Sequence, residues 1–376
     1  MPLSRLSAVQ PSIASRLSEE LSSASLPQSL LFHGPSYSGR MSAAIELAVH
    51  LTGAQDSYAR LECPDIVIVP SRDVTLRIRA MRNLFERQRR GFLLDAMIHE
   101  TRIALSPFHE VFYSGGEKEA FSAAGELSDV LYETPKEFDD RSIQEFLSRY
   151  DAALERFLSR RRRTGAFTID QIRAIQAFLQ QNASQAKVVI LENIEDVTVG
   201  AMNSILKLLE EPPEGAYIIL VSHDAGRILA TILSRVRQYA FPQIPSPLQA
   251  RLIRDVYRVQ DQTSLHDFIC SSSGLDMTAL EVKAEDFVHR VVTKRSICDG
   301  PSLGDLCSFL DQWDAYDIFL DKVVAIIEDG FLQDHIEMRR AQVMLDTLSS
   351  CRREATTFSQ NRRTMMERID RRLSAL

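Results

Sequence analysis

The sequence predicts an α/β fold, in which helices cover both faces of a parallel sheet, followed by segments that are helical only. Three observations predict it. A short apolar run at 28–34 ends in a glycine-containing loop that leads into a helical pattern at 42–51, which is the βα unit of a parallel sheet. Apolar runs at 187–193 and 217–222 have the length and composition of further buried strands. After residue 243 the strand pattern is lost.

The next elements along the chain are a second strand and a long insertion. Residues 65–69 have the pattern of a buried strand that ends at Pro70. Residues 76–163 are charged and carry apolar residues at helical spacing, so we interpret them as a helical insertion with a flexible loop at 114–126. The four arginines at 160–163 are interpreted as a solvated helix end, with contact to phosphates as the alternative.

The α/β pattern resumes after the insertion. A helix predicted at 168–181 precedes the strand at 187–193. Thr198 can cap the next helix, and Pro212 ends it before the strand at 217–222. Another helical turn and a short strand then close the α/β part.

The chain is divided into three predicted domains. The α/β domain covers 1–243 and contains the insertion. A small helical lid is predicted at 244–295 and an all-helical C-terminal collar at 296–376, with Gly300 and Pro301 marking the boundary between them.

Composition limits the class of protein. The chain has 376 residues, which predicts two or three domains of ~100–200 residues each. Hydrophobic residues make up 45% and charged residues 25%, as in ordinary globular proteins. The formal net charge of −7 argues against a surface that binds nucleic acid throughout, so any DNA contact is expected to be local.

Cysteine and terminal patterns exclude further classes. The odd number of cysteines, without CxxC spacing, argues against a disulfide scaffold or a zinc site and for a reducing cytosol. The N-terminus lacks the apolar core of a signal peptide, and no apolar run approaches the ~20 residues that span a bilayer. We therefore expect a cytoplasmic protein without zinc or a membrane segment. The cysteines are Cys63, Cys270, Cys298, Cys307 and Cys351.

The loop after the first strand has the frame of a phosphate-binding loop. The working pattern, GxxxxGK[ST], lies between a strand and a helix, as Gly34 and Gly39 do here. Arg40 holds the lysine position, where a compact charge normally lies between phosphates. Met41 holds the Ser/Thr position and cannot bind Mg²⁺, which prefers oxygen ligands, while Ser42 points elsewhere on the helix. We expect the loop shape to be retained without tight binding of Mg·ATP.

The acidic half of such a site is changed as well. In a working ATPase, two acids at the end of a buried strand hold Mg²⁺ and activate the attacking water. Here the strand ends in Glu192 and Asn193. Glu192 could still approach a metal, but the amide of Asn193 cannot serve as a general base. We interpret both as ordinary polar residues at a strand end.

Ser234 and Arg235 follow a helical pattern after the last long strand. A guanidinium at this position could reach out of the subunit and neutralise charge on a phosphoryl group bound by a neighbour, as an arginine finger does. A surface arginine at a helix end is the alternative interpretation.

Long motifs carry a resemblance to the clamp-loader family within the AAA+ ATPases. Residues 203–222, NSILKLLEEPPEGAYIILVS, resemble the family's NALLKTLEEPP segment, and ILATILSR at 228–235 is similar to its LLPTIxSRC segment. TIDQIRAIQAFL at 168–179 is similar to its IxIDQIRxL segment. The resemblance covers roughly 1–70 and 165–243, and it implies a RecA-like α/β domain followed by a lid and a collar.

The resemblance also implies a function. The family's ATP-hydrolysing gamma/tau subunits carry a lysine, a threonine and an Asp-Glu pair at the positions of Arg40, Met41 and Glu192–Asn193. This chain therefore resembles a non-hydrolysing subunit of DNA polymerase III that holds no cofactor and lends Arg235, beside Ser234, to an adjacent gamma subunit. The implied partners are gamma/tau and delta subunits, with the sliding clamp and primed DNA reached through the complex.

Two other functions remain open at this point. One is an ATP-hydrolysing gamma/tau-like subunit with an unusual phosphate loop. The other is a DNA-binding regulator that uses the inserted helices. The sequence also departs from the family: Val236 replaces a cysteine, His223 replaces a polar sensor residue, and only Cys63 stands where a zinc module needs four cysteines. The insertion has no counterpart in the family that we can place.

Overall fold

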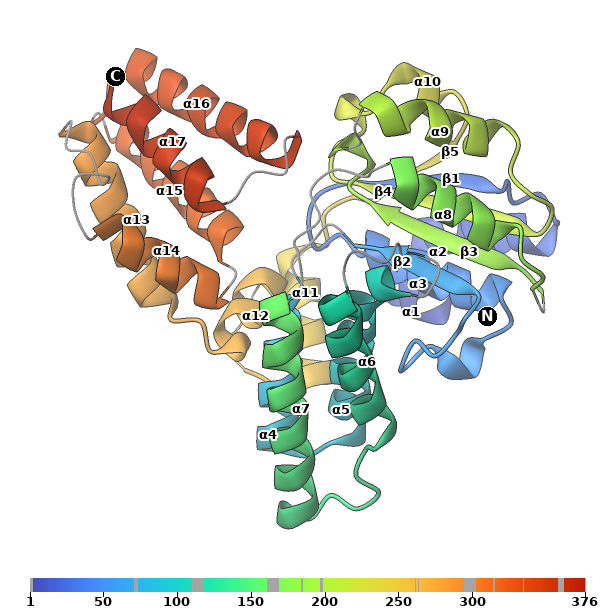
Figure 1. Ribbon diagram of the computed structural model, residues 1–376. Coiled ribbons are helices and arrows are strands. Elements are labelled where there is room, and N and C mark those ends of the chain that lie inside the picture. Colours follow the sequence, from blue (N-terminus) through green and yellow to red (C-terminus); the bar gives the residue numbers. More distant parts are fainter. Residues whose placement is uncertain are drawn as a thin grey trace. The chain divides into compact units, whose positions relative to one another are not determined.

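We describe the chain in a computed structural model (Figure 1). The described residues are 3–70, 74–109, 112, 118–160, 169–183, 185–196, 199–260, 262, 264–293, 302–313, 315–333, 335–357 and 362–375. Their contacts divide the chain into two compact units, 1–273 and 274–376.

One parallel sheet of five strands forms the centre of the first unit, as far as the described residues show. Its order is β2-β3-β4-β1-β5, and every neighbouring pair is parallel. Leu220 of β4 is the register partner of both Leu31 and Leu191, so apolar residues meet across the central strands. The strands are β1 Ser29–His33, β2 Ile66–Val69, β3 Lys187–Glu192, β4 Ala216–Ser222 and β5 Arg237–Ala240.

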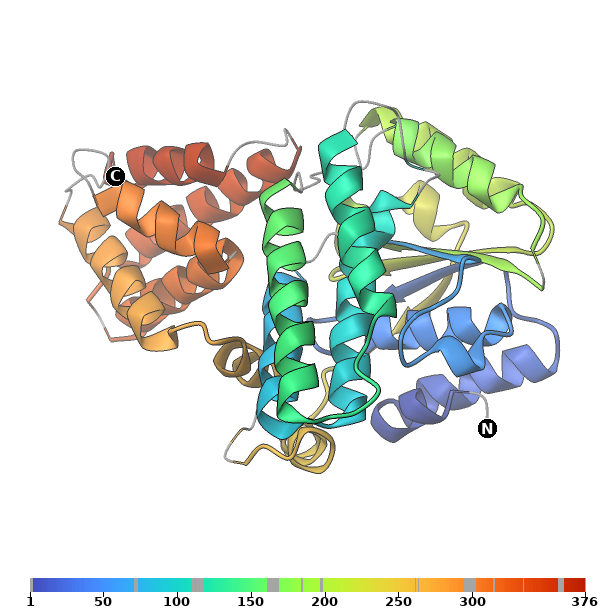
Figure 2. The ribbon, with the colours of Figure 1, turned by 60° about the horizontal axis from the view of Figure 1, so that its bottom comes forward.

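Helices cover both faces of this sheet (Figure 2). On one face lie α8 and α9, whose apolar residues pack on alternate residues of the strands, because side chains of a strand point to opposite faces in turn. On the other face α3 contacts β1, β3 and β4, and α1 packs on α3. The predicted α/β fold class is confirmed. The helices are α1 Ser4–Val9, α2 Pro11–Ser22, α3 Arg40–Leu51, α8 Ile169–Leu179 and α9 Val199–Glu210, with a short 3-10 turn at Gln55–Ser57.

The predicted insertion is helical and lies between β2 and β3. In it α4 packs on α5, α5 on α6, and α6 on α7. The hydroxyls of Thr101 and Tyr150 lie 2.6 Å apart inside this bundle, and burial raises the pKa of Tyr150. The Oγ atom of Ser106 accepts a hydrogen bond of 2.8 Å from Ile68 N, which joins the bundle to edge strand β2. The helices are α4 Thr75–Gln88, α5 Gly91–Leu105, α6 Lys118–Tyr132 and α7 Asp140–Arg160, with a 3-10 turn at Ser106–Phe108.

One prediction within the insertion is wrong. The segment 114–126 was expected to be a flexible loop, but from Lys118 onward it is helix α6. Its alanines and leucines occur at helical spacing and are buried, while Gly125 faces open space and so only weakens the helix. Arg160, the described member of the predicted arginine run, is paired with Glu119, and 161–163 lie outside the described residues.

Short helices follow the sheet and remain part of the first unit. Helix α11 continues into a π-helical turn, and α12 then packs against α4 of the insertion. The amide of Asn83 donates to the carbonyls of Ser272 and Ser273 at 3.1 and 2.9 Å. The elements after β5 are α11 Ser246–Leu252, the π-helical turn Ile253–Tyr257 and α12 Leu265–Ser273. The 3-10 turns Ile194–Asp196 and Ala225–Arg227 and helix α10 Ala230–Leu233 lie earlier, between strands of the sheet.

The second unit is helical throughout its described residues. Helix α13 packs on α15 and α17, and α16 packs on α15 and α17. The contact division therefore falls inside the predicted lid of 244–295, with α12 in one unit and α13 in the other. The three-domain division stays a prediction, and Gly300 and Pro301 lie outside the described residues. The helices are α13 Met277–Val292, α14 Ser302–Trp313, α15 Tyr316–Leu332, α16 Met338–Thr357 and α17 Arg362–Ser374.

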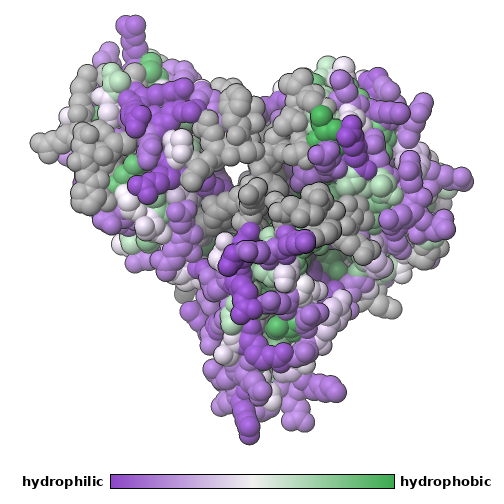
Figure 3. Space-filling view, viewed as in Figure 1, coloured by the Kyte–Doolittle hydropathy of each residue, from purple (hydrophilic) through white to green (hydrophobic). Residues whose placement is uncertain are grey.

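The surface of the molecule is mostly polar on the face shown in Figure 3, where hydrophobic side chains appear only as small separate patches. Among the described helices, none combines the length and the apolar composition that crossing a bilayer requires.

Candidate functional site

The loop between β1 and α3 has the shape that its glycines predict. Gly34 has φ +151°, and a Cβ atom added there would lie 2.1 Å from the carbonyl oxygen of Phe241, so only glycine fits. Gly39, with φ +90°, caps α3. The side-chain amide of Gln10 donates to the carbonyls of Ser38 and Pro242 at 3.0 and 2.7 Å. Hydrogen bonds within the chain therefore hold the loop closed against the segment after β5.

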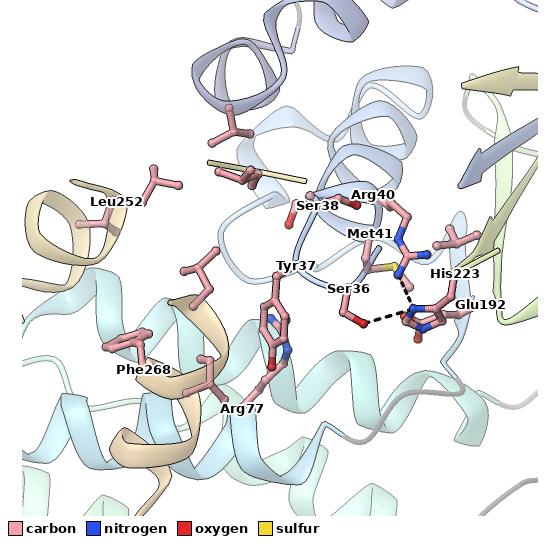
Figure 4. A pocket seen from close by; sticks show the side chains of 18 of the residues that line it. Ser36, Tyr37, Ser38, Arg40, Met41, Arg77, Glu192, His223, Leu252 and Phe268 are labelled. Atoms are coloured by element: carbon pink, nitrogen blue, oxygen red, sulfur yellow. Dashed lines mark hydrogen bonds between the residues drawn. The ribbon is translucent and has the colours of Figure 1, made fainter. Parts of the chain in front are cut away.

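Arg40, at the lysine position, is directed into the protein (Figure 4). Its side chain is only 6% exposed, Nη1 donates to the carbonyl oxygen of Ser222, and Nη2 lies 3.0 Å from Nδ1 of His223. The Oγ atom of Ser36 lies 3.3 Å from the same imidazole nitrogen. The guanidinium thus links the phosphate loop to the end of β4. Burial lowers the pKa of the nearby His33, and the positive charge of Arg40 lowers it further.

The other changed positions lie at the same edge of the sheet. Met41 is buried, Ser42 is exposed, and Glu192 is only 4% exposed at the end of β3. Asn193 has φ +55°, and its backbone N donates to the carbonyl of Val221 at 2.7 Å. Its Oδ1 is buried and lacks a hydrogen-bond partner among the described residues. A thioether and an amide at these positions do not match the oxygen ligands and the base that Mg·ATP hydrolysis requires.

A cavity of about 350 Å³ brings several of these residues together. Gly39, Arg40, Met41, Ser42 and Glu192 line it, whereas Gly34 and Asn193 do not. Its other wall is apolar and comes from the segment after β5 and from the helices that follow it, of which Figure 4 labels Leu252 and Phe268. These apolar residues are Ile244, Leu252, Val256, Leu265, Phe268 and Ile269.

The insertion contributes one cation to this cavity that sequence reasoning missed. Arg77 of α4 lies 3.4 Å from Glu100 and over the ring of Tyr37, at 5.3 Å from its centroid. Burial lowers the pKa of Arg77, but neighbouring groups raise it more, and the negative charge of Glu100 is the largest of these. An arginine inside an apolar helical pattern, RIRAMRN, was the signal available in the sequence.

Arg235 and Ser234 lie at a different place, beside the C-terminal end of α9. Nε of Arg235 donates to Glu210 Oε1 at 2.7 Å, and Nη2 contacts the same oxygen. Nη1 donates to the carbonyl of Thr231 at 2.8 Å and to Ser234 Oγ at 3.2 Å. The side chain of Arg235 is 34% exposed at a surface groove. Glu210 was not predicted as its partner.

The phosphate loop and Arg235 lie at opposite ends of the parallel strands. Leu30 pairs with Arg237, directly after the Arg235 segment, whereas the phosphate loop follows His33 at the other end of β1. Leu30 and Gly34 are four residue steps apart along the strand, which is roughly 13 Å at ~3.3 Å per residue. Arg235 therefore lies near the opposite end of the strands from the phosphate loop of its own chain.

A zinc site has no basis in the described residues. Cys63, Cys270, Cys307 and Cys351 are free thiols, and no three His, Cys, Asp or Glu side chains gather there as metal ligands would. The expectation that the chain binds no zinc stays a prediction.

Comparisons with known proteins agree on one family. Residues 126–245 match the family described as "DNA polymerase III, delta subunit". The chain is 34% identical to DNA polymerase III subunit delta' of Pseudomonas aeruginosa over 113 residues, which cover 30% of this chain and 34% of that protein. It is 30% identical to subunit delta' of Haemophilus influenzae over 124 residues, or 32% of this chain and 38% of that protein. With subunit tau of Bacillus subtilis it shares 36% identity over 80 residues, covering 21% and 14%. The chain thus spans little more than a third of the length of these two delta' relatives.

Proposed function

Because the chain is a member of the DNA polymerase III clamp-loader family, we propose that it acts as a delta' subunit that supplies an arginine finger and hydrolyses no ATP. The observation that carries the proposal is that the phosphate loop and Arg235 lie at opposite ends of the strands of one sheet. Arg40 is buried beside the carboxyl ends of the strands, whereas Arg235 lies partly exposed near their opposite ends, where its guanidinium is paired with Glu210.

The phosphate loop of this subunit acts as a structural element. A lysine would leave its ammonium free for phosphate oxygens, but Arg40 donates to Ser222 and contacts His223 instead. Met41 offers Mg²⁺ no oxygen, and Asn193 offers water no base. These three substitutions support a frame that keeps its shape and does no chemistry of its own.

Arg235 works on the nucleotide of an adjacent subunit. Its position opposite the phosphate loop of its own chain supports action in trans, since a finger must reach the transferring phosphoryl group. Arginine fingers contribute ~10³–10⁵ in rate in GTPases, and a complex with several ATP sites should lose less than this when one finger is removed. The gamma/tau subunits of the clamp loader are the proposed neighbours.

The wider setting follows from this role. The subunit joins gamma/tau and delta subunits in the cytoplasm and takes part in loading the sliding clamp onto primed DNA. An ATP-hydrolysing gamma/tau-like function is the alternative, supported by the identity with a tau subunit. The buried contacts of Arg40 favour the delta' role over this alternative.

The test is reconstitution with gamma/tau and delta subunits. We expect the chain to co-purify with them and Arg235→Ala to leave assembly intact while slowing ATP hydrolysis by the complex. Arg237→Ala, an exposed arginine two residues away, is the matched control and should leave the rate unchanged. ATP turnover by the isolated chain that Gly39→Val abolishes would instead establish the gamma/tau-like function.

A further inference from the structure

Two of the three segments that carry the family resemblance meet at one ion pair. Glu210 belongs to NSILKLLEEPP and ends α9, while Arg235 belongs to ILATILSR and follows α10. Nε and Nη2 of Arg235 contact Glu210 Oε1, and Nη1 donates to Thr231 and Ser234. All the nitrogens of the guanidinium are therefore engaged by the chain itself.

This arrangement cannot persist unchanged when the finger works. An arginine binds a phosphate most strongly by presenting one edge of its planar fork to two oxygens. In Arg235 the Nε–Nη2 edge is occupied by Glu210 and the Nη1 atom by Thr231 and Ser234. These contacts use four of the five N–H groups of the guanidinium, so a triphosphate on a neighbouring subunit that binds one edge of the fork at two points must displace at least one of these partners.

Glu210 is the partner best suited to exchange. It is the only carboxylate among the described residues that line the groove around Arg235. The side chains of Arg235 and Glu210 are 34% and 47% exposed, and ion pairs at such exposure are weak. A fully buried pair would cost far more to separate. Exchanging the carboxylate for phosphate oxygens also keeps the guanidinium paired throughout.

We propose that Glu210 is a positioning residue that holds Arg235 in a parked orientation and releases it to the triphosphate of the adjacent subunit. This proposal rests on the proposed function. Glu210 competes with the bound nucleotide for Arg235, so engagement of the finger depends on what the neighbour holds. ATP, which carries the terminal phosphate, displaces Glu210, whereas ADP leaves the pair closed.

The experiment compares Glu210→Gln with Glu211→Gln in the full chain. Glutamine keeps the shape of the side chain and removes its charge. Glu211 is the adjacent exposed acid of the same segment, and its carboxylate forms no ion pair in the described part of the chain, so it is a matched control. Association with gamma/tau is measured by titration with a non-hydrolysable ATP analogue or with ADP, and ATPase kinetics are measured in the complex.

The expected result for Glu210→Gln is association about 1.5- to 5-fold tighter with the ATP analogue, and unchanged with ADP. The KM for ATP falls by a similar factor while kcat stays constant, a split that a merely structural role would not produce. In a double-mutant cycle, Arg235→Ala abolishes the gain, because Glu210 acts through Arg235.

Three results would overturn the parked orientation. They are equal effects of the two glutamine variants, weaker association caused by Glu210→Gln, and a gain that survives in the Arg235→Ala background. The proposed function fails separately, if Arg235→Ala alone leaves the ATPase rate of the complex unchanged.

Discussion

Replacing Arg40 by alanine tests whether the former phosphate-binding position is now structural. The side chain is 6% exposed, donates to Ser222 O and contacts His223 Nδ1 at 3.0 Å. Hydrogen bonds to a charged group contribute roughly 1.5–3 kcal/mol each. Removing a buried guanidinium also relieves its desolvation, and Ser222 O keeps a second donor, Gly34 N at 3.2 Å. We therefore expect Arg40→Ala to lower the free energy of unfolding by about 2–4 kcal/mol.

Urea unfolding followed by circular dichroism measures this change. Arg40→Met keeps the packing of the stem and removes the charge and the hydrogen bonds of the guanidinium, so it should account for most of the loss. Arg237→Ala removes an exposed arginine whose ion pair with Glu20 spans 3.5 Å, and it should cost no more than about 1 kcal/mol. A loss below about 1 kcal/mol for both Arg40 variants would refute the structural role.

Nucleotide addition completes this test. A ligand present at 100 times its Kd stabilises the native state by about 2.7 kcal/mol. If Arg40 is committed to Ser222 and His223, Mg·ATP at millimolar concentration should leave the unfolding transition of the wild-type chain in place. A clear upward shift that Arg40→Ala removes would show that the arginine binds nucleotide.

Three further predictions concern the stability of the two units. Gly34→Ala should destabilise the fold by about 2–5 kcal/mol in denaturant unfolding, because its Cβ would meet the Phe241 carbonyl at 2.1 Å; a neutral result would contradict the close approach. Thr101→Val should cost about 1–3 kcal/mol, since it leaves the buried Tyr150 hydroxyl without its partner at 2.6 Å, and an unchanged midpoint would argue against that bond. Hydrogen bonds from Arg372 and Arg368 lower the pKa of Glu354 from 4.5 to about 2, so its carboxylate stabilises the second unit above pH 4.5 and this contribution is lost as pH falls through 2. Glu354→Gln should therefore lower the melting temperature at neutral pH and flatten its decline across that window; a parallel decline would exclude this role.

Local patterns were sufficient for most of the sheet. The apolar runs at 28–34, 65–69, 187–193 and 217–222 each became a strand, because continuous apolar sequence suits strands buried on both faces. Helix α6 was missed because glycine and charged residues around 114–126 obscured its buried alanines and leucines. Single glycines weaken an exposed helix face without ending it.

The functional contacts depend on the fold and not on local sequence. Arg40 meets Ser222 across 182 residues of chain, and Arg235 meets Glu210 across 25. The motifs identified Arg40 as a departure from the phosphate-loop pattern and Arg235 as a residue that the family's segment also carries. They could not show what either side chain contacts. Arg77 was hidden for the same reason, since a helix of the insertion carries it to the cavity only after folding.

The most direct measurement of the central claim is a structure of this chain assembled with gamma/tau and delta subunits and a non-hydrolysable ATP analogue. The account predicts that the Arg235 guanidinium lies within ~3 Å of a phosphate oxygen on the adjacent subunit, at hydrogen-bond distance. An assembly in which Arg235 lies far from every bound triphosphate would contradict the account.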